Sequence, residues 1–372
     1  MSYELDNNFG SDNVDNFSDI SGVVLLDLSG EANSVIIDKN GHIIVVGNTP
    51  SDDFAIVKID QNGNYVESFK NSESDTSGGV VLLDLSGGVG FSSDFANSVV
   101  VDDDNNIIVA GTSTANGNYD FAIVKIDQSG AYVDSFKKNS DISGVVLLDL
   151  SGGVFSSDLA KSVLLDNKND HIIVAGFSNA ANGNYYDFAI VKIDHSGAYV
   201  ESFKNSESEI SGVVLLDLSG TGLSSDKAYS VLLDKKNDHI IVAGTSTANG
   251  NYDDFAIVKI DHSGAYVESF KNSESDISGV VLLDLSGGVG LSTDIAKSVL
   301  LDDDNNIIVV GTSNANGNYD FAIVKYTKET KETKETKEII RKTTRRRFYI
   351  YKGGMGSPYD EWLKKINKKI NQ

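Results

Sequence analysis

The stretch SVVVDDDNNIIVAGTSTANGNYDFAIVKID, residues 98–127, decides the fold of this chain. Its apolar runs are short, are bounded by Asp, Asn, Gly and Ser, and show no helical period, so each run is predicted to be a strand. In the first copy of the stretch, Asn40-Gly41 joins two such runs. Asn-Gly is the strongest short signal for a β-hairpin, and the longer Asp-Asn clusters of later copies have the same turn chemistry. The stretch therefore predicts antiparallel hairpins.

The same stretch recurs through most of the 372-residue chain. Its DFAIVK segment returns at spacings of 67, 67, 67 and 66 residues, beginning at Asp53, Asp120, Asp187, Asp254 and Asp320. A second segment, VVLLDLSG, begins at Val23, Val80, Val145, Val213 and Val280. Five ordered copies indicate one structural unit repeated in tandem.

Each unit is predicted to be one blade of a β-propeller. Both faces of the FAIVKI and IIVAG runs are apolar, so these strands should be covered on two sides. A β-solenoid would need a shorter repeat of roughly 20–30 residues. Four or five antiparallel strands in about 66 residues, packed between neighbouring sheets, are typical of a propeller blade. The expected fold is all-β: a five-bladed β-propeller built from five tandem repeats of about 66 residues, over residues 1–326.

The ends of the repeat array suggest how the ring would close. The first four copies are followed by a Tyr-Val-x-Ser-Phe segment, but the fifth stops at Phe321–Lys325. Near the N-terminus, Tyr3–Phe9 is a degenerate version of the missing segment. We therefore expect N-terminal strands to complete the last blade and to remove its open edge.

These motifs resemble a known repeat family. The unit with Gly-Val-Val, an Asp-x-Ala-x-Ser segment, Ile-Ile-Val-Ala-Gly and Asp-Phe-Ala-Ile-Val-Lys is similar to the delta-60 repeat, and in part to the SBBP repeat of propeller proteins. The similarity covers residues 3 to about 326. It implies a propeller of a type common in bacterial surface and secreted proteins, and it brings no shared catalytic residues.

Composition changes after the fifth copy. Residues 327–340 form a Lys-Glu-Thr linker, and residues 341–372 form a basic, aromatic tail with a short C-terminal helix. Residues 328–372 carry +8, whereas the repeat region carries −31 of the total charge of −23. The tail could contact nucleic acid or an anionic membrane, or it could dock on the acidic propeller of the same or a neighbouring molecule. Its expected anchor is Arg345, Arg346, Arg347, Phe348, Tyr349 and Tyr351.

The repeats argue against catalysis. Each of the five histidines occupies a position that Asn or Gln fills in other copies, which is typical of a structural position. The recurring acids are expected to cap turns, because the paired acids of a glycosidase occur once per molecule. The chain lacks cysteine and the sequence motifs of hydrolases, metalloproteases and nucleotide-binding loops. We therefore predict no catalytic residue and no enzyme activity.

Two repeated features are candidate ligand sites. The acidic turns offer oxygen atoms suited to Ca²⁺, and the expected ligands are Asp102, Asp104, Asp302 and Asp304. No other cofactor is expected. An Asn-Gly-Asn-Tyr loop offers amides beside a tyrosine, a combination found in sugar recognition and also in ordinary polar turns. Its candidate ligand residues are Asn116, Asn118, Tyr119, Asn182, Asn184, Tyr185, Asn249, Asn251, Tyr252, Asn316, Asn318 and Tyr319.

The leading functional hypothesis is a non-enzymatic structural or interaction scaffold, in which repeated blades present one surface several times and the tail mediates self-association or binding of a protein partner. The alternatives are a lectin-like carbohydrate-binding propeller, and a hydrolase or lyase with its site at the mouth of the central channel. The acidic propeller should repel nucleic acid, which leaves the tail as the only candidate for that contact. The sequence shows neither a signal peptide nor a transmembrane segment, which favours a cytoplasmic or virion protein.

Overall fold

The computed structural model describes residues 4–10, 22–26, 28–71, 78–86, 92–150, 156–179, 185–220, 223–250, 252–272, 275, 277–286 and 292–327. Within these residues the regular elements are all β-strands, arranged in five antiparallel sheets. The all-β prediction is confirmed, and five sheets in sequence are consistent with a five-bladed propeller. The linker beyond Thr327 and the basic tail lie outside the described residues.

Four sheets have four strands and the last has three. The first contains β1 (Glu31–Ile37), β2 (Ile43–Asn48), β3 (Phe54–Ile59) and β4 (Val80–Leu83). The second contains β5 (Asp94–Val101), β6 (Ile107–Ser113), β7 (Asp120–Ile126) and β8 (Val145–Leu148). The third contains β9 (Asp158–Asp166), β10 (His171–Ser178), β11 (Asp187–Asp194) and β12 (Val213–Leu216). The fourth contains β13 (Asp226–Asp234), β14 (His239–Ser246), β15 (Asp254–Asp261) and β16 (Val280–Leu283). The fifth contains β17 (Asp294–Leu301), β18 (Ile307–Ser313) and β19 (Asp320–Tyr326).

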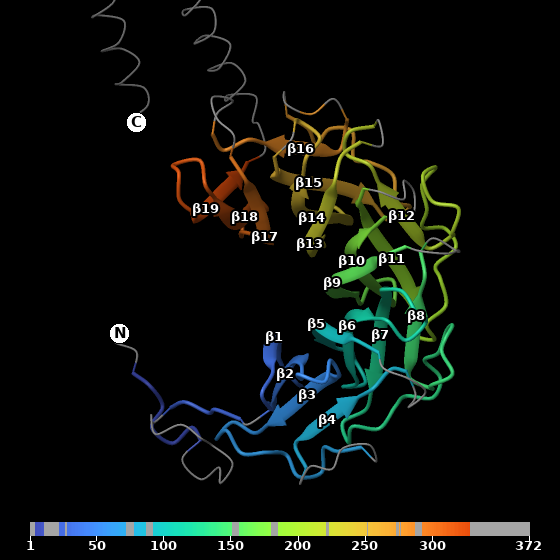
Figure 1. Ribbon diagram of the computed structural model, residues 1–372, viewed down its shortest axis with the longest axis vertical. Coiled ribbons are helices and arrows are strands. Elements are labelled where there is room, and N and C mark those ends of the chain that lie inside the picture. The colour runs from blue at the N-terminus through green and yellow to red at the C-terminus, as the bar shows by residue number, and fades with distance from the viewer. Residues whose placement is uncertain are drawn as a thin grey trace, which may run out of the picture. The chain divides into compact units, whose positions relative to one another are not determined.

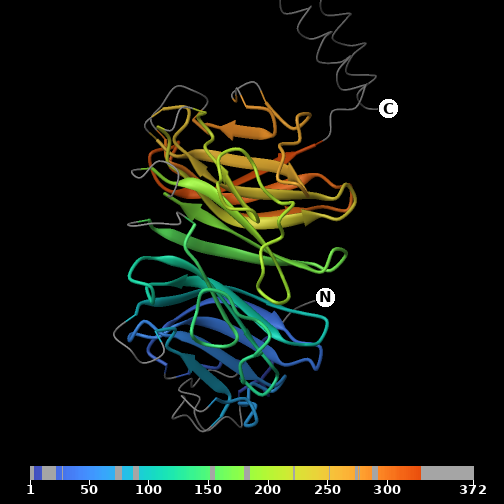
Figure 2. The same ribbon diagram turned by 90° about the vertical axis from the view of Figure 1, so that its right-hand side faces the viewer.

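The five sheets follow one another along an arc, and neighbouring sheets pack face to face (Figures 1 and 2). The first strand of each sheet, β1, β5, β9, β13 or β17, lies on the inner side of the arc, and each of them packs against the next. The VVLL strands β4, β8, β12 and β16 lie on the outer side. We call the line around which the first strands gather the axis of the arc.

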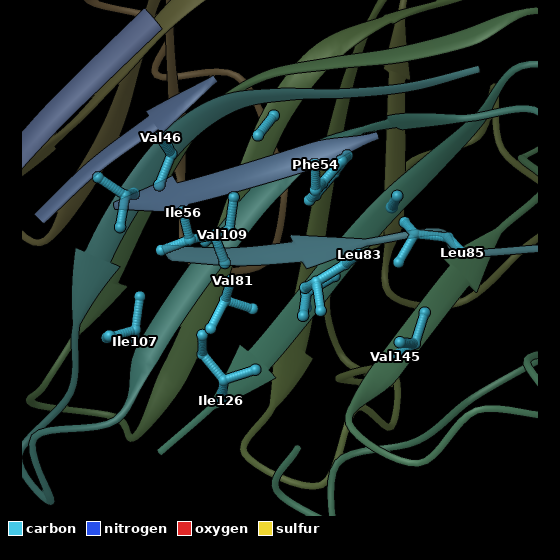
Figure 3. Packing of buried hydrophobic residues seen from close by; sticks show 14 of the residues in the cluster. Val46, Phe54, Ile56, Val81, Leu83, Leu85, Ile107, Val109, Ile126 and Val145 are labelled. Atoms are coloured by element: carbon cyan, nitrogen blue, oxygen red, sulfur yellow. The ribbon is translucent and has the colours of Figure 1, made fainter. Parts of the chain in front are cut away.

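The core lies between sheets. Phe54, Ile56 and Val81 of the first sheet interdigitate with Val109 and Ile126 of the second (Figure 3). Every residue of β7 is buried, which explains why the DFAIVKI run is apolar on both faces. Burial of each such large apolar side chain stabilises the fold by about 1.5–3 kcal/mol.

The Tyr-Val-x-Ser-Phe segment does not form the extra strand that its apolar residues suggested. Tyr132 makes a single antiparallel bridge to Ile126, and the chain then turns, with the Phe136 amide donating to the Val133 carbonyl at 2.9 Å. Phe136 is fully buried. The segment is apolar because it turns back and packs against its own sheet, where Phe136 is buried, and not because it forms a further strand.

The expected closure of the ring is not seen. Among the described residues the last sheet has three strands, and Phe321 on its outermost strand, β19, is 97% exposed, whereas its counterparts in the other four sheets are fully buried. At the other end of the arc, Val35 is 64% exposed, whereas its counterpart Val99 is 5% exposed. The two ends of the arc therefore expose the same surfaces that the internal sheets bury against each other.

The N-terminal segment lies on the first sheet instead of the last. Phe9, Leu26 and Leu28 pack against Val57, Ile59 and Val80 of that sheet, while Tyr3 lies outside the described residues. The physical reason is the length of the connection. Three residues separate Leu28 from Ala32, whereas ten separate the equivalent Leu85 and Ala96. In a propeller, the chain that leaves the outer strand of one sheet must cross three strand spacings of about 4.8 Å to reach the inner strand of the next sheet. The short link before β1 does not reach that far, so the N-terminal segment cannot take an outer-strand position in the last sheet.

Candidate functional site

A β-bulge interrupts the first strand of every sheet at the same position. In β5, Ala96 pairs with Gly111 and Ser98 pairs with Ala110, so Asn97 between them has no partner in the ladder. A bulge redirects one side chain and often occurs beside functional sites. The bulge is common to all five sheets, but its residue differs from sheet to sheet: Asn33, Asn97, Lys161, Tyr229 and Lys297.

Three aromatic rings meet on the inner side of the third and fourth sheets. Phe177 is the penultimate residue of β10, Tyr186 precedes β11, and Tyr229 is the bulge residue of β13. The Phe177 ring centroid is 5.1 Å from that of Tyr186 and 6.2 Å from that of Tyr229, both in edge-to-face geometry. Edge-to-face aromatic pairs are favourable, so the three rings form a rigid apolar platform.

Three lysines surround this platform. The Nζ atom of Lys227 lies 5.4 Å from the Tyr186 centroid, that of Lys161 lies 5.9 Å from Phe177, and that of Lys297 lies 4.1 Å from Tyr229. These are distances at which an ammonium group and an aromatic ring attract each other. We call these six residues the axial cluster: Lys161, Phe177, Tyr186, Lys227, Tyr229 and Lys297.

The electrostatics of the axial cluster favour a negatively charged ligand. Among the described residues, none of its three lysines forms an ion pair with a carboxylate. Burial, and then the positive charge of Lys297, lower the pKa of Lys161. Burial also lowers the pKa of Lys297, against the opposing effect of Asp253. Bringing an anion to this point would offset the repulsion between the two ammonium groups.

A pocket of about 250 Å³ adjoins the axial cluster on the side of the first two sheets. Its lining includes Asn97, Tyr119 and Lys161, so it shares one lysine with the cluster. The Asn97 side-chain amide donates to the Ala160 carbonyl of the next sheet at 2.8 Å, which fixes its orientation. The pocket and the cluster together form a polar and aromatic surface along the axis.

The structure divides the Asn-Gly-Asn-Tyr residues. Tyr119 lines the pocket, and the Asn116 amide donates to Asp120 at 3.0 Å. Tyr185, Tyr252 and Tyr319 are exposed on their own loops. Asn118 lies in the turn of Tyr119, Asn249 in the turn before Tyr252, and Asn316 and Asn318 in the turn before Tyr319. Asn182, Asn184 and Asn251 lie outside the described residues. The described residues of these loops therefore form no common site, and of them Tyr119 lines the pocket.

The acidic turns hold lysine where we had expected calcium. Asp102 lies 2.9 Å from Lys125 Nζ, and Asp302 lies 2.7 Å from Lys325 Nζ. Asp102 also accepts from the Asn106 backbone amide, as a turn-capping residue does. Asp104 and Asp304 do not join them in any cluster of three acids within the described residues. The six residues expected to anchor the tail, from Arg345 to Tyr351, lie outside those residues.

The axial cluster is not among the predicted sites, although the sequence carries its signal. Phe177 stands where other copies have Thr112, Thr245 or Thr312, and Tyr229 stands where they have Asn or Lys. Each of these aromatic residues occurs in one copy alone, whereas histidine recurs at its positions. The strand register and the arc are needed to show that the two aromatic positions lie close together.

Two stretches of the chain, residues 103–131 and 303–328, match the model of a family described as a domain of unknown function (DUF5122) beta-propeller. These stretches support a propeller-repeat protein. No curated protein matches the sequence. Within the described residues, the structure has no helix with the length and apolar character needed to cross a membrane.

Several solved structures are similar to this chain. The periplasmic gluconolactonase PpgL of Pseudomonas aeruginosa is 10% identical with a TM-score of 0.40, over 81% of this chain and 73% of its own. An exo-1,5-alpha-L-arabinanase from a bovine ruminal metagenomic library is 10% identical with a TM-score of 0.37, over 82% and 97%. The alpha-L-arabinanase of Cellvibrio cellulosa is 8% identical with a TM-score of 0.39, over 81% and 93%. Similarity this low transfers no activity to this chain.

These names nevertheless require a correction. We had expected a non-enzymatic scaffold, but the similar structures are named as a gluconolactonase and as arabinanases, not as scaffolds. The expectations of a structural protein and of no enzyme activity are therefore withdrawn, and nothing supports the expected virion location. The near-identity of the blades does not exclude a site either, because the blades differ at their axis-facing positions.

Proposed function

We propose that this chain binds an anionic carbohydrate at the axial cluster. The observation that carries the proposal is the convergence of three lysines without carboxylate partners on three packed aromatic rings. The apolar face of a sugar ring can stack on an aromatic platform, and the ammonium groups can pair with its carboxylates. The neighbouring pocket adds Asn97 and Tyr119 as polar partners for hydroxyl groups.

The charge of the whole molecule makes the position of these lysines informative. The repeat region is strongly acidic and should repel anions in general. A local group of cations within that field gives selective binding of an anion at one place. Uronic-acid polymers combine sugar rings with regularly spaced carboxylates, so they are the ligand class that this surface fits.

The same cluster supports a second candidate function, cleavage of a uronate polymer by β-elimination. The lowered pKa of Lys161 increases the fraction of neutral amine available as a base. Burial and Asp253 raise the pKa of Tyr229, which keeps its hydroxyl protonated as a donor. Lys161 would remove the proton beside the carboxylate, that electron pair would form the new double bond, and the departing glycosidic oxygen would take the proton of Tyr229.

The test is calorimetric titration of the full chain with polygalacturonate oligomers at low salt, with neutral arabinan oligomers as the comparison. The other sheets provide substitutions compatible with the fold: Phe177→Thr, Lys161→Asn and Tyr229→Asn introduce residues that equivalent positions already hold. Each variant should weaken binding about tenfold or more, since about 1.4 kcal/mol of lost contact is tenfold in affinity. Lys236→Asn, on the exposed turn between β13 and β14, should bind as the wild type does.

Unchanged binding in all three cluster variants, or equal affinity for the neutral oligomers, would refute the binding proposal. The ultraviolet absorbance of an unsaturated product, followed in the same mixtures, tests the second candidate. If the wild type forms the unsaturated product and Lys161→Asn does not, the result supports elimination at this site. Tight binding without product supports recognition alone and rejects the lyase.

We further propose that each blade is one repeat of about 66 residues of the delta-60 type. The two stretches that match the DUF5122 propeller model begin at equivalent positions, Asp103 and Asp303, in the second and fifth copies. Limited proteolysis tests this assignment, because cleavage between repeats should release fragments that differ by whole multiples of that length.

A further inference from the structure

Each internal sheet of the arc packs against its neighbours with both faces (Figure 1). We call the face toward the preceding sheet the back face and the face toward the following sheet the front face. At the first junction, Phe54 and Ile56 of a front face pack against Val109 and Ala122 of the back face of the second sheet. The residues at the same positions meet at the second and third junctions. One interface is therefore repeated along the chain.

The last sheet leaves its front face uncovered. Phe321 and Ile323 of β19 hold the positions of the phenylalanine and isoleucine just described, and both are exposed. Val310 of β18 and Leu300 of β17, whose counterparts also belong to the first junction, are exposed as well. A group of exposed large apolar side chains that extends across three strands indicates a contact surface.

The first sheet leaves its back face partly uncovered. Val35 and Ile37 of β1 are exposed, whereas Val99, the counterpart of Val35 in the second sheet, is buried against the first sheet. The N-terminal segment covers the outer part of this back face, where Leu26 and Leu28 pack against β3 and β4. The inner part of the face, along β1, remains open.

The two uncovered faces match in extent. Within the described residues, the last sheet has three strands and lacks the VVLL strand that packs on the outer part of an internal back face. On the first sheet, the N-terminal Val23–Leu28, which has the same VVLLDL sequence, covers that outer part instead. The open part of the back face can therefore accept a sheet of three strands.

A pocket of about 350 Å³ with a largely apolar lining lies on this back face beside Gly47. At the internal junctions, a phenylalanine ring of the preceding sheet lies against the equivalent glycine. A Cβ atom on Gly111 would lie 2.7 Å from Phe54 Cζ, and the corresponding distance at Gly244 is 2.8 Å. The pocket is therefore the position of such a ring, and Phe321 is the exposed ring of the same type at the other end of the arc.

We infer that the front face of the last sheet packs on the back face of the first sheet of a second copy of this chain, with Phe321 of one copy in the pocket beside Gly47 of the next. The contact would continue between two copies the sheet packing that is already present within one. Because the two faces differ, the contact is head-to-tail, and each copy keeps one face free for a further copy. This inference does not depend on ligand binding at the axial cluster.

The occupant is a second copy, because the two faces of one chain are held apart. They lie at the two ends of the arc (Figures 1 and 2), and β17 does not pack against β1 as successive inner strands pack against each other. Hydrogen bonds fix neighbouring sheets: the Asp158 amide donates to the Tyr119 carbonyl, and the Asp226 amide donates to the Tyr186 carbonyl, both at 2.6 Å. Close-packed junctions of this kind resist the bending that closure of the arc would need.

Electrostatics distinguish this contact from docking of the basic tail. The two faces are apolar, whereas each copy carries a net charge of −23, so two copies repel each other. Salt shortens the Debye length from about 10 Å at 0.1 M to about 3 Å at 1 M, so it should strengthen the association. A contact between the basic tail and the acidic repeats would weaken under the same change.

The test is sedimentation velocity of the full chain over about a hundredfold range of concentration, at about 0.1 M and 1 M NaCl. The wild type should form dimers and longer assemblies as its concentration rises, and more of them at the higher salt. Phe321→Asp and Val35→Asp each alter one face at an exposed position, and each should weaken association at least about tenfold. The control, Leu223→Asp, changes an exposed leucine between β12 and β13 and should associate as the wild type does.

A mixture of the two variants tests the head-to-tail geometry. Phe321→Asp keeps an intact back face and Val35→Asp keeps an intact front face, so an equimolar mixture should form a dimer with one chain of each, which neither variant forms alone. Circular dichroism checks that both variants are folded. A wild type that stays monomeric at both salt concentrations overturns the proposal. So does association that weakens at the higher salt, which assigns the contact to the tail, or a mixture that remains monomeric.

Discussion

The same aspartate–lysine pair lies in two different environments in the second and the last sheet. At the end of β5 that leads into the turn, Asp102 pairs with Lys125 at 2.9 Å, and both side chains are buried. The same pairing joins Asp38 to Lys58 and Asp234 to Lys259. In the last sheet, Asp302 pairs with Lys325 at 2.7 Å, but the Lys325 side chain is 50% exposed.

The difference shows how burial decides what one ion pair contributes. In the second sheet both partners are removed from water, so each charge depends on the other for neutralisation. In the last sheet the lysine lies on β19, the outermost strand, where water reaches it. The buried pairs should therefore contribute much more to the stability of the fold than the exposed pair.

The largest single-residue effect is expected at the buried pair of the second sheet. Lys125→Met would leave Asp102 buried without its cation, and we expect a loss of about 3–5 kcal/mol in the free energy of unfolding. Urea denaturation measures this change. Adding Asp102→Asn to the same chain should recover part of the loss, since no unpaired charge then remains.

The matched control is Lys325→Met in the last sheet. Lys325 pairs with Asp302 in the same way, but its side chain is 50% exposed, so water can replace the lost partner. The control should therefore change stability much less than Lys125→Met does. Equal losses in the two variants would show that burial does not distinguish these pairs.

A smaller effect is expected at the bulge of β5. A Cβ atom on Gly111 would lie 1.9 Å from the Phe95 carbonyl oxygen, so Gly111→Ala must distort the inner strand between Asp94 and Asp102. We expect a loss of about 3 kcal/mol, measured by thermal or urea denaturation. Gly117→Ala is the control: nothing lies within 4 Å, and its positive φ alone should cost about 1–2 kcal/mol. Similar losses in both variants would contradict a special role for the bulge.

The repeats and the strands could be predicted from the sequence because their signals are local. The apolar composition of the DFAIVKI and IIVAG runs by itself predicts strands that are covered on both faces, and β7 and β6 are buried along their whole length. Closure of the ring could not be judged in this way. The apolar pattern of Val23–Leu28 matches that of an outer strand, but the short link to β1 places the segment on the first sheet.

The sites were harder to predict because they join residues of different sheets. The sequence predicts the recurring Asp84 and Asp120 as turn caps, because it does not show that neighbouring sheets bring each of them close to two other acids. Asp102 suggested calcium because it begins a run of three acids, yet the lysine that neutralises it is 23 residues further on. The lysines and aromatic rings of the axial cluster converge only through the bulge register and the arc.

Double-mutant cycles on the two pairs test this difference most directly. Asp102→Asn, Lys125→Met and the two combined give the coupling free energy of the buried pair from urea denaturation, and Asp302→Asn with Lys325→Met gives that of the exposed pair. The account predicts a coupling free energy at Asp102–Lys125 that is several times that at Asp302–Lys325. Equal coupling free energies in the two pairs would contradict it.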